Sequence, residues 1–108
     1  MRAILINPWT KEITEVAYNG DFNQMYRLLS NPLGSKVKVF TCVLELDNGD
    51  TLYVDNEGFM KKSNRVFEIK GAVFAGNGLI IGEDEACDAC DAKSMLVEMQ
   101  NLITWKGM

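Results

Sequence analysis

The sequence predicts an α+β fold: a mostly antiparallel sheet built from hairpins, one helix after the second strand, and a C-terminal helix packed on the sheet. Short β-prone runs follow one another with turn residues between them, and only two stretches space their apolar residues as a helix does. The regular strand-helix alternation of a parallel sheet is missing. With 108 residues, 47% of them hydrophobic, the chain is expected to form a single domain over residues 1–108.

The chain is expected to open with a β-hairpin. Residues Ala3 to Ile6 and Ile13 to Val16 are short β-prone runs, and the segment between them is rich in turn-forming residues. Pro8 in this segment has no backbone N–H to donate to a ladder, which favours a turn over a continuous strand.

A helix is predicted from Asp21 onward. Asp21 is a suitable N-cap, and Gln24 follows it by three residues, as in a capping box. Asn31-Pro32 would end the helix, because proline cannot continue the hydrogen-bond ladder. One face of this helix is apolar and comprises Phe22, Met25, Tyr26 and Leu29.

The run from Lys36 to Leu46 reads as a strand. Its apolar residues change parity at Val39-Phe40, which predicts either a bulge there or a central strand buried on both faces. Cys42 lies inside this run, and a lone cysteine in such a position is expected to be a small, buried and inert hydrophobic residue.

The middle of the chain is predicted to be a series of hairpins. Asn48-Gly49 tolerates the positive φ angles of a type I′ turn, so Thr51 to Asp55 should return antiparallel to the preceding strand. Asn77-Gly78 is expected to form a second turn of this kind. The further strands expected on either side of it span residues 66–69, 71–75 and 79–81.

The C-terminal segment from Ala92 to Trp105 recovers helical spacing, and we expect this helix to pack on the sheet. Its predicted apolar stripe comprises Ala92, Met95, Leu96, Met99, Leu102 and Ile103.

Negative charge is concentrated in one segment before this helix. The formal charge of the chain is −4, yet five acids and no basic residue occupy positions 83–91, while eleven basic residues against ten other acids leave +1 elsewhere. A nucleic-acid partner is therefore not expected, because phosphate neutralisation needs a basic surface. The five acids are Glu83, Asp84, Glu85, Asp88 and Asp91.

The chain is expected to be cytoplasmic and not associated with a membrane. Its N-terminus lacks the apolar core of a secretory signal, and no segment approaches the roughly 20 apolar residues that span a bilayer. Three cysteines are an odd number without the spacing of a secreted disulfide framework, which favours reduced thiols in a reducing compartment.

Cys87 and Cys90 form a Cys-x-x-Cys pair within the acidic segment. Dithiol catalysis is disfavoured, because the surrounding carboxylates oppose a thiolate and no proline follows Pro32 to supply a cis-proline beside the pair. Zinc is the alternative, since two thiolates supply half of a tetrahedral site, but the chain has no histidine to complete it. Carboxylates or a second subunit of a dimer could supply the other ligands. The spacing of oxygen ligands does not match a calcium loop.

The interpretation we prefer is a solvent-facing acidic loop that needs no cofactor. Its carboxylates would be favoured by the positive end of the last helix dipole, with Asp88 or Asp91 as the N-cap. The same loop could bind another protein through Glu83, Asp84, Glu85 and Asp88. Trp9 beside Pro8 could add an aromatic contact, although a ring folded over a sheet edge is the alternative.

Enzyme activity is not expected. Without histidine, acid-base chemistry would fall to carboxylates, lysine or tyrosine, and the spacing singles out no pair of these. The glycine-rich segment 71–82 opens no helix and lacks the Lys-Ser/Thr of a phosphate loop.

Three segments carry a resemblance to a known family: ILINPWTKEITEV at the start, NGDTLYVDNEG in the middle, and IKGAVFAGNGLIIGED. From about Met1 to Asp84 the chain resembles the domain-of-unknown-function family 3846. The resemblance implies a protein of a bacteriophage, plasmid or other mobile element, with no catalytic residues to carry over. The Cys-x-x-Cys pair is not part of the family pattern.

Three functional hypotheses follow. The first is a non-enzymatic accessory protein that binds a host or phage protein through the acidic loop and Trp9, with inhibition of that protein as one such role. The second is a small zinc module that uses Cys87 and Cys90. The third is a domain that captures a small ligand between sheet and helix.

Overall fold

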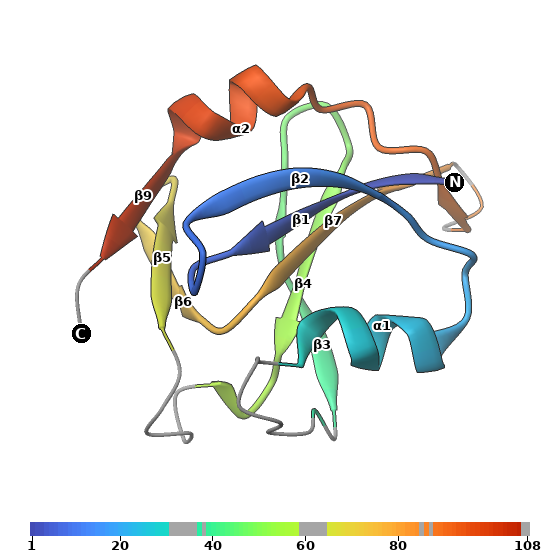
Figure 1. The fold of residues 1–108 in the computed structure, drawn as a ribbon. Coiled ribbons are helices and arrows are strands. Elements are labelled where there is room, and N and C mark those ends of the chain that lie inside the picture. The colour runs from blue at the N-terminus through green and yellow to red at the C-terminus, as the bar shows by residue number, and fades with distance from the viewer. Residues whose placement is uncertain (31–36, 38, 59–64, 85, 87, 107–108) are drawn as a thin grey trace.

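A computed structural model describes residues 1–30, 37, 39–58, 65–84, 86 and 88–106 (Figure 1). Within them the chain has an α+β fold with antiparallel sheets, which confirms the predicted class. The strands are β1 (Arg2–Asn7), β2 (Glu12–Ala17), β3 (Phe40–Glu45), β4 (Thr51–Asp55), β5 (Val66–Ile69), β6 (Ala72–Ala75), β7 (Gly78–Glu83), β8 (Ala89–Cys90) and β9 (Ile103–Lys106). The helices are α1 (Phe22–Leu29) and α2 (Leu96–Leu102).

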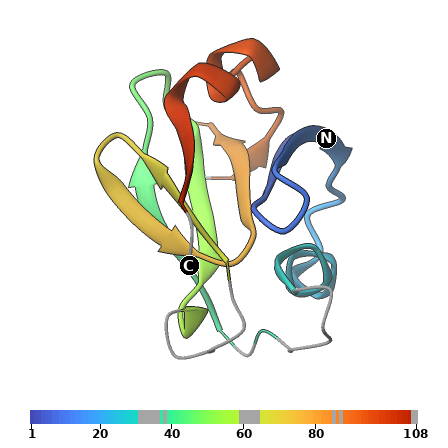
Figure 2. The same ribbon diagram turned by 60° about the vertical axis from the view of Figure 1, so that its left-hand side comes forward.

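The strands form a large and a small sheet. The large sheet has the order β2-β1-β7-β4-β3, with the short β8 paired to the end of β7, and the small sheet has the order β6-β5-β9. Figure 2 shows the small sheet on one side of β4 and β7 and α1 on the other. The large sheet therefore has two differently covered faces.

The central strand β7 contributes to a separate core on each face. Ile80 belongs to the core between the two sheets, which also takes residues from β1, β4, β5, α2 and β9. Leu79 and Ile81 point to the other face, where α1 contributes Met25 and Leu29. This alternation follows from the period of two along a strand.

The opening hairpin and Asp21 as the N-cap of α1 are as predicted, but Gln24 does not complete the expected capping box. Asp21 is the N-cap, and its carboxylate accepts a hydrogen bond from the Asn23 N–H at 2.8 Å. The Gln24 side chain does not return to Asp21. Its Oε1 accepts from the Asn19 N–H at 2.7 Å, so it ties the helix to the segment after β2. Phe22 was predicted on the apolar face but is 65% exposed.

The prediction for the next strand is partly wrong. β3 begins at Phe40, lies at the edge of the described sheet, and has its irregularity between Cys42 and Leu44 instead of at Val39-Phe40. β3 pairs only with β4 among the described strands, so it has no neighbour on its outer side, and Cys42 is exposed, not buried as predicted. Asn31-Pro32 lies outside the described residues.

The hairpin between β3 and β4 forms, but its turn is not type I′. Only Gly49 has a positive φ, of 91°, and the Gly49 N–H donates to the Leu46 carbonyl. Consecutive positive φ angles occur instead at Lys70 (51°) and Gly71 (82°), between β5 and β6. These are the angles that a type I′ turn requires.

The expected hairpin at Asn77-Gly78 is wrong. β6 belongs to the small sheet, whereas β7 enters the centre of the large sheet between β1 and β4. Asn77 is buried, and its amide donates to the Leu28 carbonyl at 3.0 Å, which satisfies one of the last carbonyls of α1.

The predicted C-terminal helix over Ala92 to Trp105 is also wrong at both ends. α2 has only seven residues, and the chain continues as β9, which pairs with β5. The residues Ile103, Thr104 and Trp105 are β-branched or aromatic, so they suit a strand once β5 offers an edge to pair with. Met95 and Leu102, expected on the packed stripe, are exposed.

Candidate functional site

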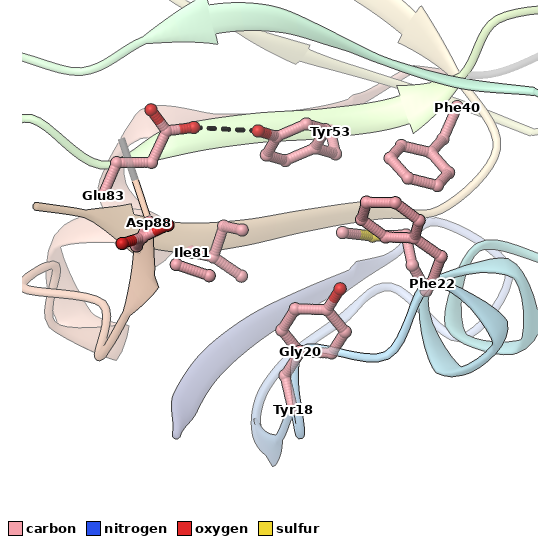
Figure 3. Close-up of a pocket in the computed structure, with 10 residues that line it drawn as sticks. Tyr18, Gly20, Phe22, Phe40, Tyr53, Ile81, Glu83 and Asp88 are labelled. Carbon is pink, nitrogen blue, oxygen red and sulfur yellow. Dashed lines mark hydrogen bonds between the residues drawn. The ribbon is translucent and has the colours of Figure 1, made fainter. Parts of the chain in front are cut away.

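A cavity of about 350 Å³ lies on the α1 side of the large sheet (Figure 3). Ile81 of β7 is on its floor, while Tyr53 of β4 and Tyr18, one residue after β2, line it from neighbouring segments. Phe22, Met25 and Phe40 form an apolar end, and Glu83 and Asp88 an acidic end. Cavities of this size and mixed character are typical of small ligand sites.

The apolar end is built from aromatic rings in edge-to-face contact. The ring centroid of Phe40 lies 5.5 Å from Phe22, 5.2 Å from Tyr26 and 5.8 Å from Tyr53. This geometry is favourable for aromatic pairs and joins the exposed start of α1 to the edge of the sheet. It holds the wall of the cavity in place.

Glu83 is held by hydrogen bonds from β4. Its Oε1 accepts from the Tyr53 hydroxyl at 2.8 Å and from the Thr51 hydroxyl at 3.2 Å. Burial and the Glu83 carboxylate raise the pKa of Tyr53 to about 12. Tyr53 therefore stays protonated at neutral pH and keeps its role as a donor to Glu83.

Tyr18 is the most deeply buried of the aromatic residues in the cavity, with only 2% of its surface exposed. Burial, and then Asp21, raise the pKa of its hydroxyl, so the group is neutral. Figure 3 shows this hydroxyl pointing toward the space beside Ile81. It has no hydrogen-bond partner among the described residues.

The acidic segment is held by two strands, while its acids Asp84, Asp88 and Asp91 are exposed, as expected of a solvent-facing segment. β8 pairs with β7, with Gly82 opposite Cys90 and Glu83 opposite Ala89. A Cβ at Gly82 would lie 2.3 Å from the Asp91 carbonyl oxygen, so the close approach of the two segments requires glycine. Asp91 also accepts from the Arg2 N–H, which ties the segment to β1.

The expected N-cap role of Asp88 or Asp91 is wrong. α2 begins at Leu96, five residues after Asp91, with Met95 as its N-cap and Glu98 accepting from the Met95 N–H at 3.0 Å. The Asp84 carboxylate is used within the loop, where it accepts from the Ala86 and Asp88 N–H groups. The Asp88 carboxylate is left exposed at the cavity.

The structure brings together two of the predicted partner-binding residues. Glu83 and Asp88 line one cavity, and Asp84 is exposed beside them, while Glu85 lies outside the described residues. Trp9 is not among the residues that line the cavity. Its half-buried ring stacks with the Arg65 guanidinium at 5.5 Å from the ring centroid.

The zinc hypothesis stays a prediction. Cys87 lies outside the described residues, and Cys90 is a half-buried free thiol. The described part of the chain contains no group of three or more side chains placed to hold a metal ion. Cys42 is an exposed residue opposite Tyr53, and its thiol donates to the Leu44 carbonyl. Partial desolvation of the thiol, and then the charges of Glu83 and Glu45, raise its pKa, while the backbone hydrogen bond with Leu44 lowers it.

Two features of the structure were not predicted from the sequence. One is the cavity itself, because Tyr18 and Tyr53 carry no local signal that distinguishes a cavity wall from a core. The other is Asp50, which is fully buried and accepts hydrogen bonds from the Lys93 N–H, the Ser94 N–H and the Ser94 hydroxyl. Asp50 thereby fixes the segment that leads into α2.

Comparisons with models of protein families, with curated proteins and with solved structures found no match for this chain. Among the described residues, no helix has the length and apolar character needed to cross a membrane. The cavity and its residues are therefore the basis for a functional proposal.

Proposed function

We propose that this protein is a non-enzymatic binding module that takes a positively charged group of a partner protein into the acidic end of its cavity. The observation that carries the proposal is the placement of Glu83 and Asp88 beside an apolar floor and aromatic walls. The half-buried Glu83 carboxylate attracts a cation more strongly than a carboxylate on an open surface does, because water screens it less, and the exposed Asp88 adds a second negative charge beside it.

The state of the polar groups supports binding over catalysis. Glu83 shares one oxygen with two hydroxyl donors, and Tyr53, with a pKa of about 12, is a poor base at neutral pH. The chain has no histidine, the commonest proton-transfer residue near neutral pH. These groups are suited to holding a charge in place.

The cellular setting that we propose rests on the family resemblance. A cytoplasmic accessory protein of a phage or other mobile element would bind a host or phage protein, and blocking a basic site on that protein would make it an inhibitor. An acidic surface of this kind also speeds the encounter with a basic partner.

The test is capture of a partner from a bacterial lysate by the wild-type protein and by Glu83→Gln. Glu12→Gln is the matched control, because it removes the same charge from β2, away from the cavity. We expect a partner that wild-type and Glu12→Gln retain, that Glu83→Gln loses, and that elutes with rising salt. Equal capture by all three proteins would contradict a role for the cavity.

A further inference from the structure

We propose that the cavity binds a primary alkylammonium group, with the nitrogen at Glu83 and Asp88 and the alkyl chain over Ile81. This inference rests on the proposed function and names the chemistry that it would recognise. Two sources supply such a group: a lysine side chain of a partner protein, or a free aliphatic amine.

The acidic end has uncompensated charge. Neither Glu83 nor Asp88 forms an ion pair within the described chain, and no lysine or arginine is among the residues that line the cavity. Glu83 is fixed in position by Tyr53 and Thr51, so a cation would not have to order it. A preorganised carboxylate loses less entropy when it binds.

The hydrogen bonds of Glu83 favour an ammonium over a guanidinium. The Tyr53 hydroxyl donates to its Oε1, and the single Thr51 hydroxyl proton is shared between that oxygen and the Ile81 carbonyl, so Oε2 is the open acceptor. A guanidinium binds best when both oxygens of one carboxylate accept its parallel N–H groups. An ammonium carries three separate donors, which suit single oxygens from Glu83 and Asp88.

The rest of the cavity suits an aliphatic chain. Ile81 and Met25 are almost fully buried and present an apolar surface next to the aromatic rings of Phe40 and Tyr53. A volume of about 350 Å³ is at the small end of the range for ligand pockets. It fits a side chain or a short amine better than a folded segment.

The Tyr18 hydroxyl adds a polar group to the wall of the cavity. It has no hydrogen-bond partner among the described residues, and it is open to the cavity instead of being enclosed by protein, although only 2% of Tyr18 is exposed. It points toward the cavity from the side opposite Tyr53 (Figure 3). With the ammonium at the acidic end, a second polar group at the other end of the alkyl chain, such as the backbone amide of a lysine residue, would be its partner.

The first experiment is an NMR titration of the wild-type protein with three probes: n-pentylamine, Nα-acetyl-lysine methylamide and Nα-acetyl-arginine methylamide. n-Pentanol is the uncharged control. We expect the two amines to shift the signals of Ile81 and Glu83, with affinity falling about tenfold in Glu83→Gln and unchanged in Glu12→Gln. Saturable binding of pentanol equal to that of pentylamine would overturn the inference.

The second experiment uses Tyr18→Phe, which removes one oxygen atom. Since the hydroxyl has no partner in the described chain, its loss should leave the melting temperature unchanged or higher. Affinity for the lysine probe should still fall severalfold, while affinity for n-pentylamine should not, because pentylamine has no second polar group to meet the hydroxyl. A lower melting temperature with unchanged affinity would assign the hydroxyl a structural role and contradict its role in binding.

The outcomes separate this inference from the proposed function. Binding of the lysine probe over pentylamine supports a protein source, and the reverse preference supports a free amine. Preference for the arginine probe, with loss of partner capture in Glu83→Gln, overturns the alkylammonium inference but leaves the proposed function standing. If no cationic probe binds and Glu83→Gln still captures the partner, both are wrong.

Discussion

The two faces of β7 differ in how completely they are covered. On one face, Ile80 packs among residues from β1, β4, β5, α2 and β9, and the small sheet covers this core. On the other face, α1 covers Leu79, while Ile81 lines a cavity that Tyr18, Tyr53 and Glu83 also line. Covering both faces equally would have left no room for a ligand.

The distribution of polar groups follows this difference. The closed face is apolar at its centre, and Asp50, the fully buried carboxylate at its margin, has all its contacts satisfied by Lys93 and Ser94. The open face holds Glu83 with one open oxygen and Tyr18 with an unpartnered hydroxyl among the described residues. The closed face thus stabilises the fold, and the open face carries the candidate site.

Two matched substitutions on β7 test the difference between its two faces most directly. Ile80→Ala should lower the free energy of unfolding by about 3 to 4 kcal/mol, because a rigid, closed core cannot fill the space that it leaves. Ile81→Ala should cost about 2 kcal/mol, since its side chain borders an existing cavity. Urea denaturation measures both, and equal losses would contradict the difference between the faces.

Asp50→Asn tests whether the polar margin of the closed face supports its core. The amide oxygen can replace Oδ2, which accepts all three donors, but the amide nitrogen then faces the Lys93 N–H at the Oδ1 position and the charged acceptor is lost, which should cost about 2 to 3 kcal/mol. Asp47→Asn is the control from the same turn, because its side chain is 98% exposed and its ion pair with Lys70 is a surface contact. Thermal unfolding should separate the two variants, and similar melting temperatures would count against a structural role for Asp50.

Local sequence signals predicted the elements whose partners are near in the chain. Residues 3–6 and 13–16 form the first hairpin, and Asp21 begins α1. Asn48-Gly49 marks the β3–β4 hairpin, because Gly49 supplies the positive φ that its turn needs. Each of these signals acts within a few residues.

Elements that depend on distant partners were not predicted correctly. Residues 103–105 were predicted as the end of a helix, but they belong to β9, which pairs with β5. β7 was predicted to form a hairpin with β6, but it lies between β1 and β4. In both cases strand pairing across the fold outweighs local preference. The same limit applies to the site: charge density identified Glu83 and Asp88, but Tyr18 and Tyr53 join them only through the sheet.

Gly82→Ala tests the open face alone, because it should displace one wall of the cavity on that face. The new Cβ would overlap the Asp91 carbonyl oxygen, and relieving this should cost about 2 kcal/mol and separate β8 from β7. Gly71→Ala is the control: its site is open, but its φ of 82° should cost about 1 kcal/mol without affecting the cavity. Faster amide exchange at Cys90, whose N–H faces β7 in the hydrogen-bonded pair with Gly82, is expected in Gly82→Ala only. Protection of the Cys90 amide in both variants would mean that the segment adapts without unpairing.

Tyr53→Phe gives the smallest expected effect and a distinct pH dependence. At neutral pH it removes one hydrogen bond to Glu83, worth about 1 kcal/mol. The pKa of Tyr53 is about 12 in the folded protein and about 10 in the unfolded chain, so between these values the unfolded chain loses the proton first. The free energy of unfolding of the wild type should therefore fall as the pH rises through this window. The difference in the free energy of unfolding between the wild type and Tyr53→Phe should become smaller in the same window. Tyr18, whose pKa is also raised, is present in both proteins, so the difference between them isolates Tyr53. Urea denaturation from pH 9 to pH 11.5 measures this difference in the free energy of unfolding. A difference that stays constant would show that folding does not raise the pKa of Tyr53.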